Sequence, residues 1–232
     1  EERETRYGDL MIHNVQVADL PLMTFSSARF KPELRERDRA VWRLEHDREV
    51  MKLLPSTDLI VLLGYMWWFG EEMCQKRTAI NLHPALPTGP KGTYREVIWQ
   101  LIRERAIETG VMMHLVTPEL DRGPIISFCH FSIRGGDFDP FWQDMEKRLK
   151  KETLEEIAAK EGENNSLFKL IRQKGVIREF PMINWTIKIL AERIIKVENG
   201  KVIDSQGQVL ESGYNLTIEI DTIAKEKGGK LN

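Results

Sequence analysis

Cysteine, long apolar runs and an excess of charge of either sign are all scarce in this sequence. Only Cys74 and Cys129 occur in 232 residues, which excludes a disulfide-rich secreted scaffold and fits a reducing cytoplasm. No apolar stretch approaches the ~20 residues of a membrane-spanning helix, so no membrane association is expected. The net charge of −2 supplies no bulk attraction to nucleic acid or to an anionic membrane. The spacing of cysteine and histidine matches no zinc site, and no metal is expected.

What the chain does have is an alternation of apolar runs and helical patterns, which predicts an α/β fold. Continuous apolar runs are typical of strands buried on both faces, so we expect a mostly parallel sheet flanked by helices. The expected strands cover residues 20–27, 58–63, 79–83, 111–117 and 125–133. The expected helices cover residues 38–54 and 93–105, and Thr93 with Glu96 forms a capping box at the start of the second helix.

The composition changes near residue 137 and divides the expected organisation into three segments. Residues 1–136 carry the α/β pattern, and residues 137–175 form a charged helical insertion whose Lys and Glu residues indicate a solvated surface. Residues 176–232 carry the Asn199–Gly200 dipeptide, a strong signal for a two-residue hairpin turn. Helical patterns cover residues 166–173 and 177–192. We expect a carboxyl-terminal helix and β-hairpin extension that completes the same domain.

Three polar residues occur where strands are expected to end. Asn81 and His83 lie two residues apart in one strand, so their side chains point to the same face. Pro84 ends this strand, and open α/β sheets place their ligand crevice at the carboxyl ends of strands. Asp121 comes from a second turn and can reach the same point. An amide, an imidazole and a carboxylate together can polarise a carbonyl, hold an oxyanion and move a proton.

Four short sequence segments are individually weak signals but form a specific pattern through their order and spacing. They are Asp58–Met66 (DLIVLLGYM), Ile80–Pro87 (INLHPALP), Thr109–Val116 (TGVMMHLV) and Leu120–Ile126 (LDRGPII). In this order and spacing they resemble the folate-dependent formyltransferases, and most closely the branch that acts on glycinamide ribonucleotide. The resemblance covers residues 20–135 and 176–215 and implies a Rossmann-like formyltransferase fold.

The resemblance implies transfer of a formyl group from 10-formyltetrahydrofolate, a co-substrate, to a small amine. In this reading His83 donates to the developing oxyanion and acts as the general acid, and Asn81 is a second donor. Asp121 orients the imidazole and favours its protonated form, because a nearby opposite charge favours a cation. His114, in a neighbouring strand, is expected to be structural or to support the site indirectly.

Two loops are implied as the walls of a folate pocket. The residues are Leu63, Gly64, Tyr65, Met66 and Trp67 on one side and Val116, Thr117, Glu119 and Leu120 on the other. Gly64 lets the backbone approach a flat heterocycle closely, and the aromatic and methionine side chains supply apolar surface. The alternative for Trp67, Trp68 and Phe69 is a place in the core or in a subunit contact.

Arg43, Lys91 and Gly92 are the candidate residues for binding the acceptor. A helix amino terminus beside Lys91 can hold an anion, although an ordinary Gly-Pro loop would have the same sequence. Arg43 matches a family position near the substrates, and its alternative is a surface charge. Glycinamide ribonucleotide, a purine-biosynthesis intermediate, is the default acceptor.

Other functions stay open on this sequence. The same triad can activate water, which describes a 10-formyltetrahydrofolate hydrolase, and other acceptors are an aminosugar nucleotide or the amino group of methionyl-tRNA. The weak net charge argues against tRNA, because phosphate contacts need clustered Lys and Arg. A non-catalytic folate-binding protein is a third class, and a homodimer is left open.

The start of the chain departs from the family pattern. The family normally opens with a strand and a Gly-rich loop that receives the acceptor's phosphate, and this sequence begins instead with Glu1 in a charged stretch. We therefore expect an amino-terminally trimmed chain.

Overall fold

The computed structural model describes residues 6–65, 67, 69–119 and 121–228, and it divides into two compact units. The first unit contains residues 1–60 and 66–78, and the second contains residues 61–65 and 79–232. The boundaries expected at residues 136 and 175 both lie inside the second unit.

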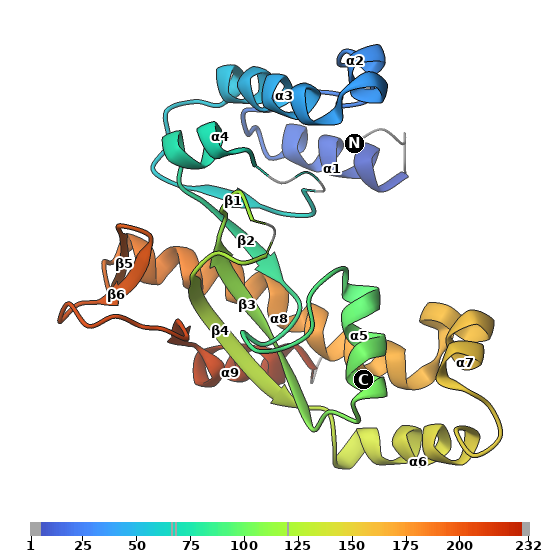
Figure 1. Ribbon diagram of the computed structural model, residues 1–232. Coiled ribbons are helices and arrows are strands. Elements are labelled where there is room, and N and C mark those ends of the chain that lie inside the picture. The colour runs from blue at the N-terminus through green and yellow to red at the C-terminus, as the bar shows by residue number, and fades with distance from the viewer. Residues whose placement is uncertain (1–5, 66, 68, 120, 229–232) are drawn as a thin grey trace. The chain divides into compact units, whose positions relative to one another are not determined.

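The described part of the first unit is helical. Its helices are α1 (Arg6–Val17), α2 (Pro32–Arg37), α3 (Arg39–Leu53) and α4 (Glu71–Lys76), all shown in Figure 1. The Asp38 carboxylate caps α3 by accepting from the backbone N–H groups of Ala40 at 3.2 Å and Val41 at 3.0 Å. These are donors that a helix start leaves without intrahelical partners. The predicted helix at residues 38–54 is confirmed.

The strand predicted at residues 20–27 is wrong, because this stretch contains no strand. Pro21 removes a ladder donor, and the side chains of Leu20 and Met23 are 59% and 56% exposed, so the run buries no continuous apolar side. Only its end turns inward, where the buried Ser27 hydroxyl lies 3.0 Å from Nε2 of His46.

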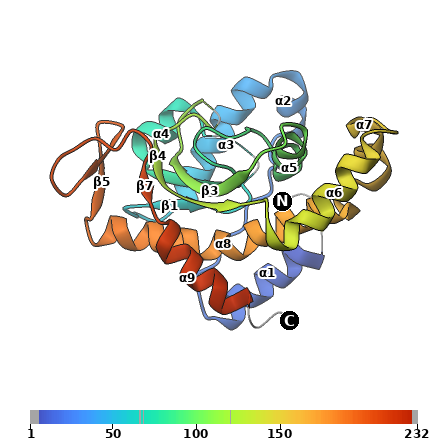
Figure 2. The same ribbon diagram turned by 90° about the horizontal axis from the view of Figure 1, so that it is seen from below.

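A five-stranded sheet in the order β1–β2–β3–β4–β7 organises the second unit. The strands are β1 (Ile60–Leu62), β2 (Ala79–His83), β3 (Glu108–Leu115), β4 (Ile125–Ser132) and β7 (Tyr214–Asn215). The long helix α8 (Ser166–Ala191) runs along β3 and β4, and α9 (Thr217–Gly228) packs on β4, as Figure 2 shows. The predicted α/β class with a helix-flanked sheet is confirmed.

The directions of the strands are mixed. β2 pairs with β3 and β3 pairs with β4 in antiparallel fashion, whereas β4 and β7 are parallel. The turn at residues 116–124 that joins β3 to β4 is too short for a parallel crossover, which needs a dozen or more residues. The expectation of a mostly parallel sheet is corrected for these pairs.

Helix α5 (Tyr94–Arg103) begins at the predicted capping box. The Glu96 carboxylate accepts from the backbone N–H of Thr93 at 2.7 Å, and the Thr93 hydroxyl oxygen accepts from the N–H of Glu96 at 3.4 Å. The buried face of α5 then packs into the main core of the unit.

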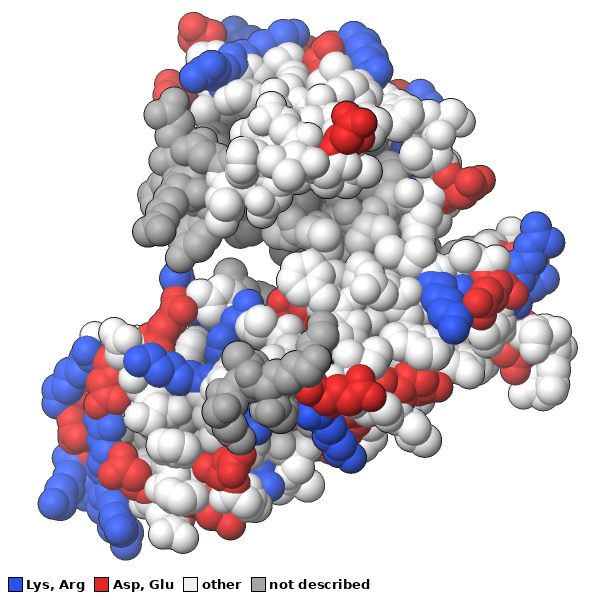
Figure 3. Space-filling view, turned by 180° about the vertical axis from the view of Figure 1, so that it is seen from behind, with Lys and Arg blue, Asp and Glu red and all other residues white. Residues whose placement is uncertain are grey.

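The charged segment after residue 137 contributes to the same core as α5. It forms α6 (Asp139–Arg148) and α7 (Leu154–Glu161). In Figure 3 Lys and Arg alternate with Asp and Glu over this region, at the lower left. Its inner side is apolar, however, because Trp142, Met145 and Ile157 are buried in the cluster that also holds α5. The segment is therefore solvated on one side and structural on the other.

The two helical patterns predicted at residues 166–173 and 177–192 form one helix, α8, in the structure. Gly175 lies between the two predicted helices but inside α8, although glycine has a low helix propensity. Pro181 is buried inside α8, so packing overrides its intrinsic preference. The hairpin of β5 (Ile195–Glu198) and β6 (Lys201–Asp204) is confirmed, with positive φ angles of 50° at Asn199 and 72° at Gly200.

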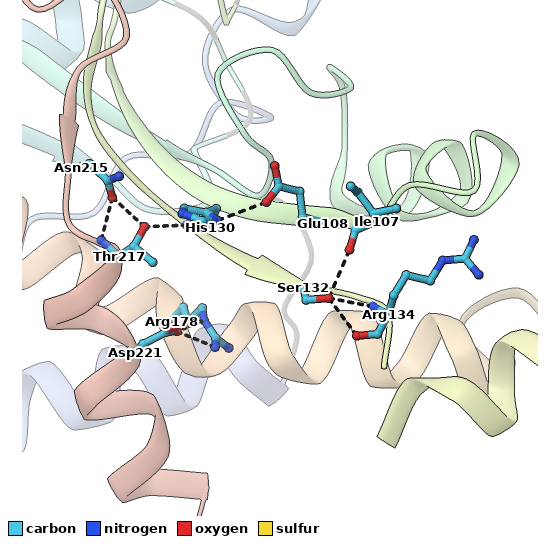
Figure 4. Close-up of polar contacts among 9 residues, drawn as sticks. All are labelled: Ile107, Glu108, His130, Ser132, Arg134, Arg178, Asn215, Thr217 and Asp221. Atoms are coloured by element: carbon cyan, nitrogen blue, oxygen red, sulfur yellow. Dashed lines mark hydrogen bonds and ion pairs between the residues drawn. The ribbon is translucent and has the colours of Figure 1, made fainter. Parts of the chain in front are cut away.

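Polar contacts fasten the carboxyl-terminal elements to the sheet, as Figure 4 shows. The backbone N–H of His130 on β4 donates to Oγ1 of Thr217 at 3.2 Å, and the backbone N–H of Thr217 donates to Oδ1 of Asn215 at 2.9 Å. Arg178 on α8 pairs with Asp221 on α9 at 2.7 Å. These contacts hold α9 against β4 and α8.

Candidate active site

The antiparallel pairing of β2 with β3 places two polar side chains opposite each other. Asn81 is the register partner of His114, and directly opposed residues of an antiparallel pair project to the same face. Nδ2 of Asn81 lies 3.5 Å from Nε2 of His114. His114 also has its Nδ1 within 3.0 Å of the carbonyl oxygen of Leu115, so its ring is fixed at both nitrogens.

Asp121 joins this pair from the turn between β3 and β4. Its Oδ1 lies 3.4 Å from Nε2 of His114, and its side chain is 14% exposed. Asp121 adopts a left-handed backbone with φ of 52°, a conformation that Asp tolerates better than most residues. Position 123 requires glycine because the backbone of Leu115 passes close to it: an added Cβ would lie 1.7 Å from the Leu115 carbonyl oxygen.

The structure therefore pairs Asp121 with His114, and not with His83 as the sequence led us to expect. The hydrogen bond from His114 holds the pKa of the Asp121 carboxyl below its usual value, and the nearby His83 and Lys91 act in the same direction. His114 was expected to be structural or to support the site indirectly, and the structure places it between Asn81 and Asp121. A sequence signal for this role of His114 was present, because His114 is the one polar residue in the apolar run at residues 111–116.

His83 has a different partner. Its Nε2 lies 2.9 Å from the carbonyl oxygen of Pro90, so Nε2 carries the proton and donates it. Burial lowers the pKa of His83 below its usual value, and this effect outweighs the raising influences of the Pro90 carbonyl and the Asp121 carboxylate. The lowered pKa favours a neutral imidazole at pH 7 over the expected protonated form, and it leaves Nδ1 as a proton acceptor.

The residues predicted to line a folate pocket divide between the two units. Leu63, Gly64 and Tyr65 belong to the second unit, as do Val116, Thr117 and Glu119, whereas Trp67 belongs to the first. Met66, Trp68 and Leu120 lie outside the described residues.

The backbone of the loop at residues 63–65 is open. Gly64 has φ of 66° and nothing within 4 Å of an added Cβ, and Leu63 is 59% exposed. This geometry leaves backbone groups accessible to the edge of a flat ligand. In the β3–β4 turn, the Thr117 hydroxyl donates to the Glu119 carbonyl at 3.0 Å and fixes the local course of the backbone.

Within the first unit, the aromatic residues of this loop also have packing roles. Trp67 lies edge-on to Trp42 with ring centroids 5.0 Å apart, and Phe69 is 1% exposed. The alternative of a core position therefore describes Phe69. Arg43 lies on α3 in the same unit and is half-buried.

Lys91 and Gly92 precede α5 in the second unit. The α5 amino terminus already has an anionic partner, because Glu96 accepts from both the backbone N–H and the hydroxyl of Thr93, at 2.7 Å and 2.9 Å. The helix end is thus less available to a substrate anion than the sequence implied. Lys91 is exposed, and its charge lowers the pKa of both His83 and Asp121, so it contributes positive potential to the site.

Residues 6–65, 67, 69–119 and 121–228 contain no group of three His, Cys, Asp or Glu side chains arranged to hold a metal ion. Over the same described residues, no helix is long and apolar enough to cross a membrane.

Comparisons with known proteins give a match to one family model and to solved structures of similar fold. A family model described as formyl transferase matches residues 12–157. The phosphoribosylglycinamide formyltransferase of Coxiella burnetii is 22% identical, with a TM-score of 0.55 over 92% of this chain and 82% of that one. The glycinamide ribonucleotide transformylase 1 of Symbiobacterium toebii is 19% identical, with a TM-score of 0.57 over 87% of this chain and 76% of that one. No curated protein sequence matches.

Proposed function

The chain belongs to the formyl transferase family, and on that premise we propose that it transfers a formyl group from 10-formyltetrahydrofolate to a small amine through Asn81, His83 and Asp121. The observation that carries the proposal is the Asn81–His114–Asp121 chain of polar contacts beside a buried, neutral His83. Asn81 supplies an amide donor, His83 a proton acceptor, and Asp121 a carboxylate held in place by His114. These are the groups that acyl transfer to an amine requires.

The reaction begins when the neutral amine attacks the formyl carbon. A C–N bond forms, and the carbonyl electron pair moves to oxygen, where the Asn81 amide N–H can donate to the oxyanion. His83 takes the proton that the amine loses, because its neutral ring has Nδ1 available. The C–N10 bond then breaks, and N10 of the folate receives the proton from His83. The products are a formamide and tetrahydrofolate.

Asp121 contributes when His83 becomes a cation. Its negative charge raises the pKa of His83 against the effect of burial, so it stabilises the imidazolium formed during the reaction more than the neutral starting ring. His114 keeps Asp121 ionised and in place for this purpose. Asp121 thus acts on the transition state through charge, without a direct hydrogen bond to His83 in this structure.

The default acceptor is glycinamide ribonucleotide. Support comes from the names of the matched structures, which are phosphoribosylglycinamide formyltransferases, and from the net charge of −2, which does not favour tRNA. For the donor, the open backbone at Gly64 supports folate binding by the loop at residues 63–65 of the second unit. Arg43 and Lys91 are the candidate contacts for the acceptor's anionic group.

The test is incubation of the full chain with 10-formyltetrahydrofolate and a panel of amines, followed by mass spectrometry. A mass increase of one formyl group on glycinamide ribonucleotide supports the whole proposal. Formylation of a different amine supports the chemistry and replaces the acceptor. Release of formate without any formylated amine identifies a hydrolase, and an absence of both formate and formylated product would overturn the proposal.

A further inference from the structure

The position of the proton on His83 depends on one backbone carbonyl. Nε2 of His83 lies 2.9 Å from the carbonyl oxygen of Pro90, and His83 is 3% exposed. In a neutral imidazole, the hydrogen bond made by one nitrogen decides which nitrogen carries the proton. Displacement of the Pro90 carbonyl would therefore let the proton occupy Nδ1, the nitrogen that the proposed reaction needs as a proton acceptor.

The loop that carries Pro90 is fixed on both sides of it. Before Pro90, the backbone N–H of Gly89 donates to the carbonyl oxygen of Leu86 at 2.8 Å. After Pro90, Oε2 of Glu96 accepts from the backbone N–H and from the hydroxyl of Thr93, at 2.7 Å and 2.9 Å. Because Thr93 follows Pro90 closely in the chain, the Glu96 carboxylate sets where the loop joins α5.

Gly92 brings the loop directly onto this carboxylate. Its φ of 110° lies in the region that favours glycine, and an added Cβ would lie 2.6 Å from Oε2 of Glu96. The backbone N–H and then the hydroxyl of Thr93 hold the pKa of the Glu96 carboxyl below its usual value. Glu96 is therefore ionised at pH 7 and can accept both hydrogen bonds.

We propose that Glu96 is a positioning residue for formyl transfer, which holds residues 89–93 so that the Pro90 carbonyl keeps His83 in its Nε2–H form. The inference rests on the proposed function, because it concerns the base of that reaction. Glu96 acts through the loop and not by touching the ring. Within the described part of the chain, Pro90 is the one hydrogen-bond partner of the His83 ring, since Asp121 pairs with His114 and acts on His83 through charge.

A second capping box in the same unit supplies a matched control. Glu156 accepts from the backbone N–H of Thr153 at 2.8 Å, and the Thr153 hydroxyl oxygen accepts from the N–H of Glu156 at 3.2 Å. This box begins α7 and follows the turn after α6, and that turn does not contain the partner of His83. Loss of either box removes stabilisation at a helix start, but only loss of the Glu96 box should affect the imidazole.

The first experiment measures the tautomer of His83 in the full chain. Nitrogen NMR of the histidine rings distinguishes a protonated from an unprotonated nitrogen and needs no substrate, and the spectrum of His83→Gln assigns the signals. We expect the Nε2–H form in the unmodified chain and in Glu156→Ala, and a mixture of both forms in Glu96→Ala. Glu96→Gln should restore the single form, because a glutamine oxygen can accept from the Thr93 N–H.

Kinetics then tests whether this tautomer matters for the reaction. Glu96→Ala should lower kcat roughly tenfold and change KM less, because misplacing a reacting group by ~1 Å can cost about 10²-fold and the loop is loosened rather than removed. Glu156→Ala should keep the kcat of the unmodified chain. Gly92→Ala is an independent route to the same effect, since its Cβ would displace the Glu96 carboxylate, and it should shift the tautomer in the same direction.

Three results would overturn the inference while leaving the proposed function intact. They are an unchanged His83 tautomer in both Glu96→Ala and Gly92→Ala, an equal loss of kcat in Glu96→Ala and Glu156→Ala, and a failure of Glu96→Gln to restore the single tautomer. Absence of formyl transfer in the unmodified chain is the separate outcome that removes the proposed function. The tautomer measurement still shows in that case whether Glu96 controls the imidazole.

Discussion

Oδ1 of Asp121 lies 3.4 Å from Nε2 of His114, and this contact fixes the carboxylate at the edge of the sheet. Removing the charge with Asp121→Asn should lower kcat by roughly 100-fold, near the small end of the range for groups that assist proton transfer, and change KM less. Steady-state kinetics with the preferred amine measures this. Glu198→Gln, in the β5–β6 hairpin, is the charge-matched control and should retain full activity. A loss below about threefold for Asp121→Asn would remove the carboxylate from the mechanism.

His83 should set the acidic limb of the pH–rate profile. As a base it must be neutral, and its pKa is lowered from 6.5 by burial. Activity should therefore rise with pH and reach its plateau with a midpoint below 6.5, whereas an exposed histidine would give a midpoint near 6.5. Asp121→Asn removes an influence that raises this pKa, so the midpoint should move further down. Measuring kcat/KM across pH in both proteins checks the sign.

Replacement of His83 should be far more damaging than replacement of an exposed histidine. His83→Ala removes the proton acceptor, and the expected loss in kcat is about 10²–10⁴-fold. His130 supplies the control, because its ring is partly exposed and pairs with Glu108 at 3.2 Å away from the site. His130→Ala should stay within about twofold of the unmodified chain, and equal losses in the two variants would contradict the role of His83.

His114 is proposed as a positioning residue for Asp121. His114→Gln keeps an N–H donor, whereas His114→Ala removes it and leaves a carboxylate partly buried without its partner. We expect His114→Ala to raise the pKa of Asp121, because its largest lowering influence is the hydrogen bond from His114. NMR titration of the carboxyl carbon in both variants tests this. A merely structural role would lower the melting temperature without moving the titration.

Replacement by alanine should lower the stability of the fold at Gly123 and raise it at Gly175. Gly123→Ala would place a Cβ 1.7 Å from the Leu115 carbonyl oxygen, and such overpacking costs typically about 1–3 kcal/mol of unfolding free energy, and occasionally more. Gly175, inside α8, has nothing within 4 Å of an added Cβ, so Gly175→Ala should stabilise by about 0.5–1 kcal/mol through helix propensity. Urea unfolding of both variants measures the difference, and a destabilising Gly175→Ala would show that its helix is strained.

Local sequence signals predicted local structure well. The Thr93–Glu96 box begins α5 and Asn199–Gly200 forms the hairpin turn, because each signal depends on a few neighbouring backbone groups. Gly175, between two predicted helices but inside α8, and the residues from 20 to 27 show the limit. Whether a helix continues through a glycine, or an apolar run finds a partner strand, depends on tertiary packing that the local sequence does not contain.

The sequence predicted three residues of the candidate site, and the structure brings two of them, Asn81 and Asp121, together through His114. Asn81, His83 and Asp121 were identified from residue type and strand position, but the partner of Asp121 depends on the register of β2 against β3, which sets His114 opposite Asn81. The protonation of His83 depends on burial, which outweighs the carboxylate whose presence the sequence reveals. Register and burial are properties of the assembled sheet.

The apolar side of α6 and α7 limits how far this protein can be shortened. Trp142, Met145 and Ile157 fill the cluster against which α5 packs. Helix α5 follows directly on the loop whose Pro90 carbonyl accepts a hydrogen bond from Nε2 of His83. A minimal catalytic fragment that omitted residues 139–165 would expose that cluster to water and release the loop. From its sequence, the charged segment after residue 137 looks like a surface insertion that could be removed. In the structure, however, it helps to hold the His83 imidazole in place, through its packing against α5.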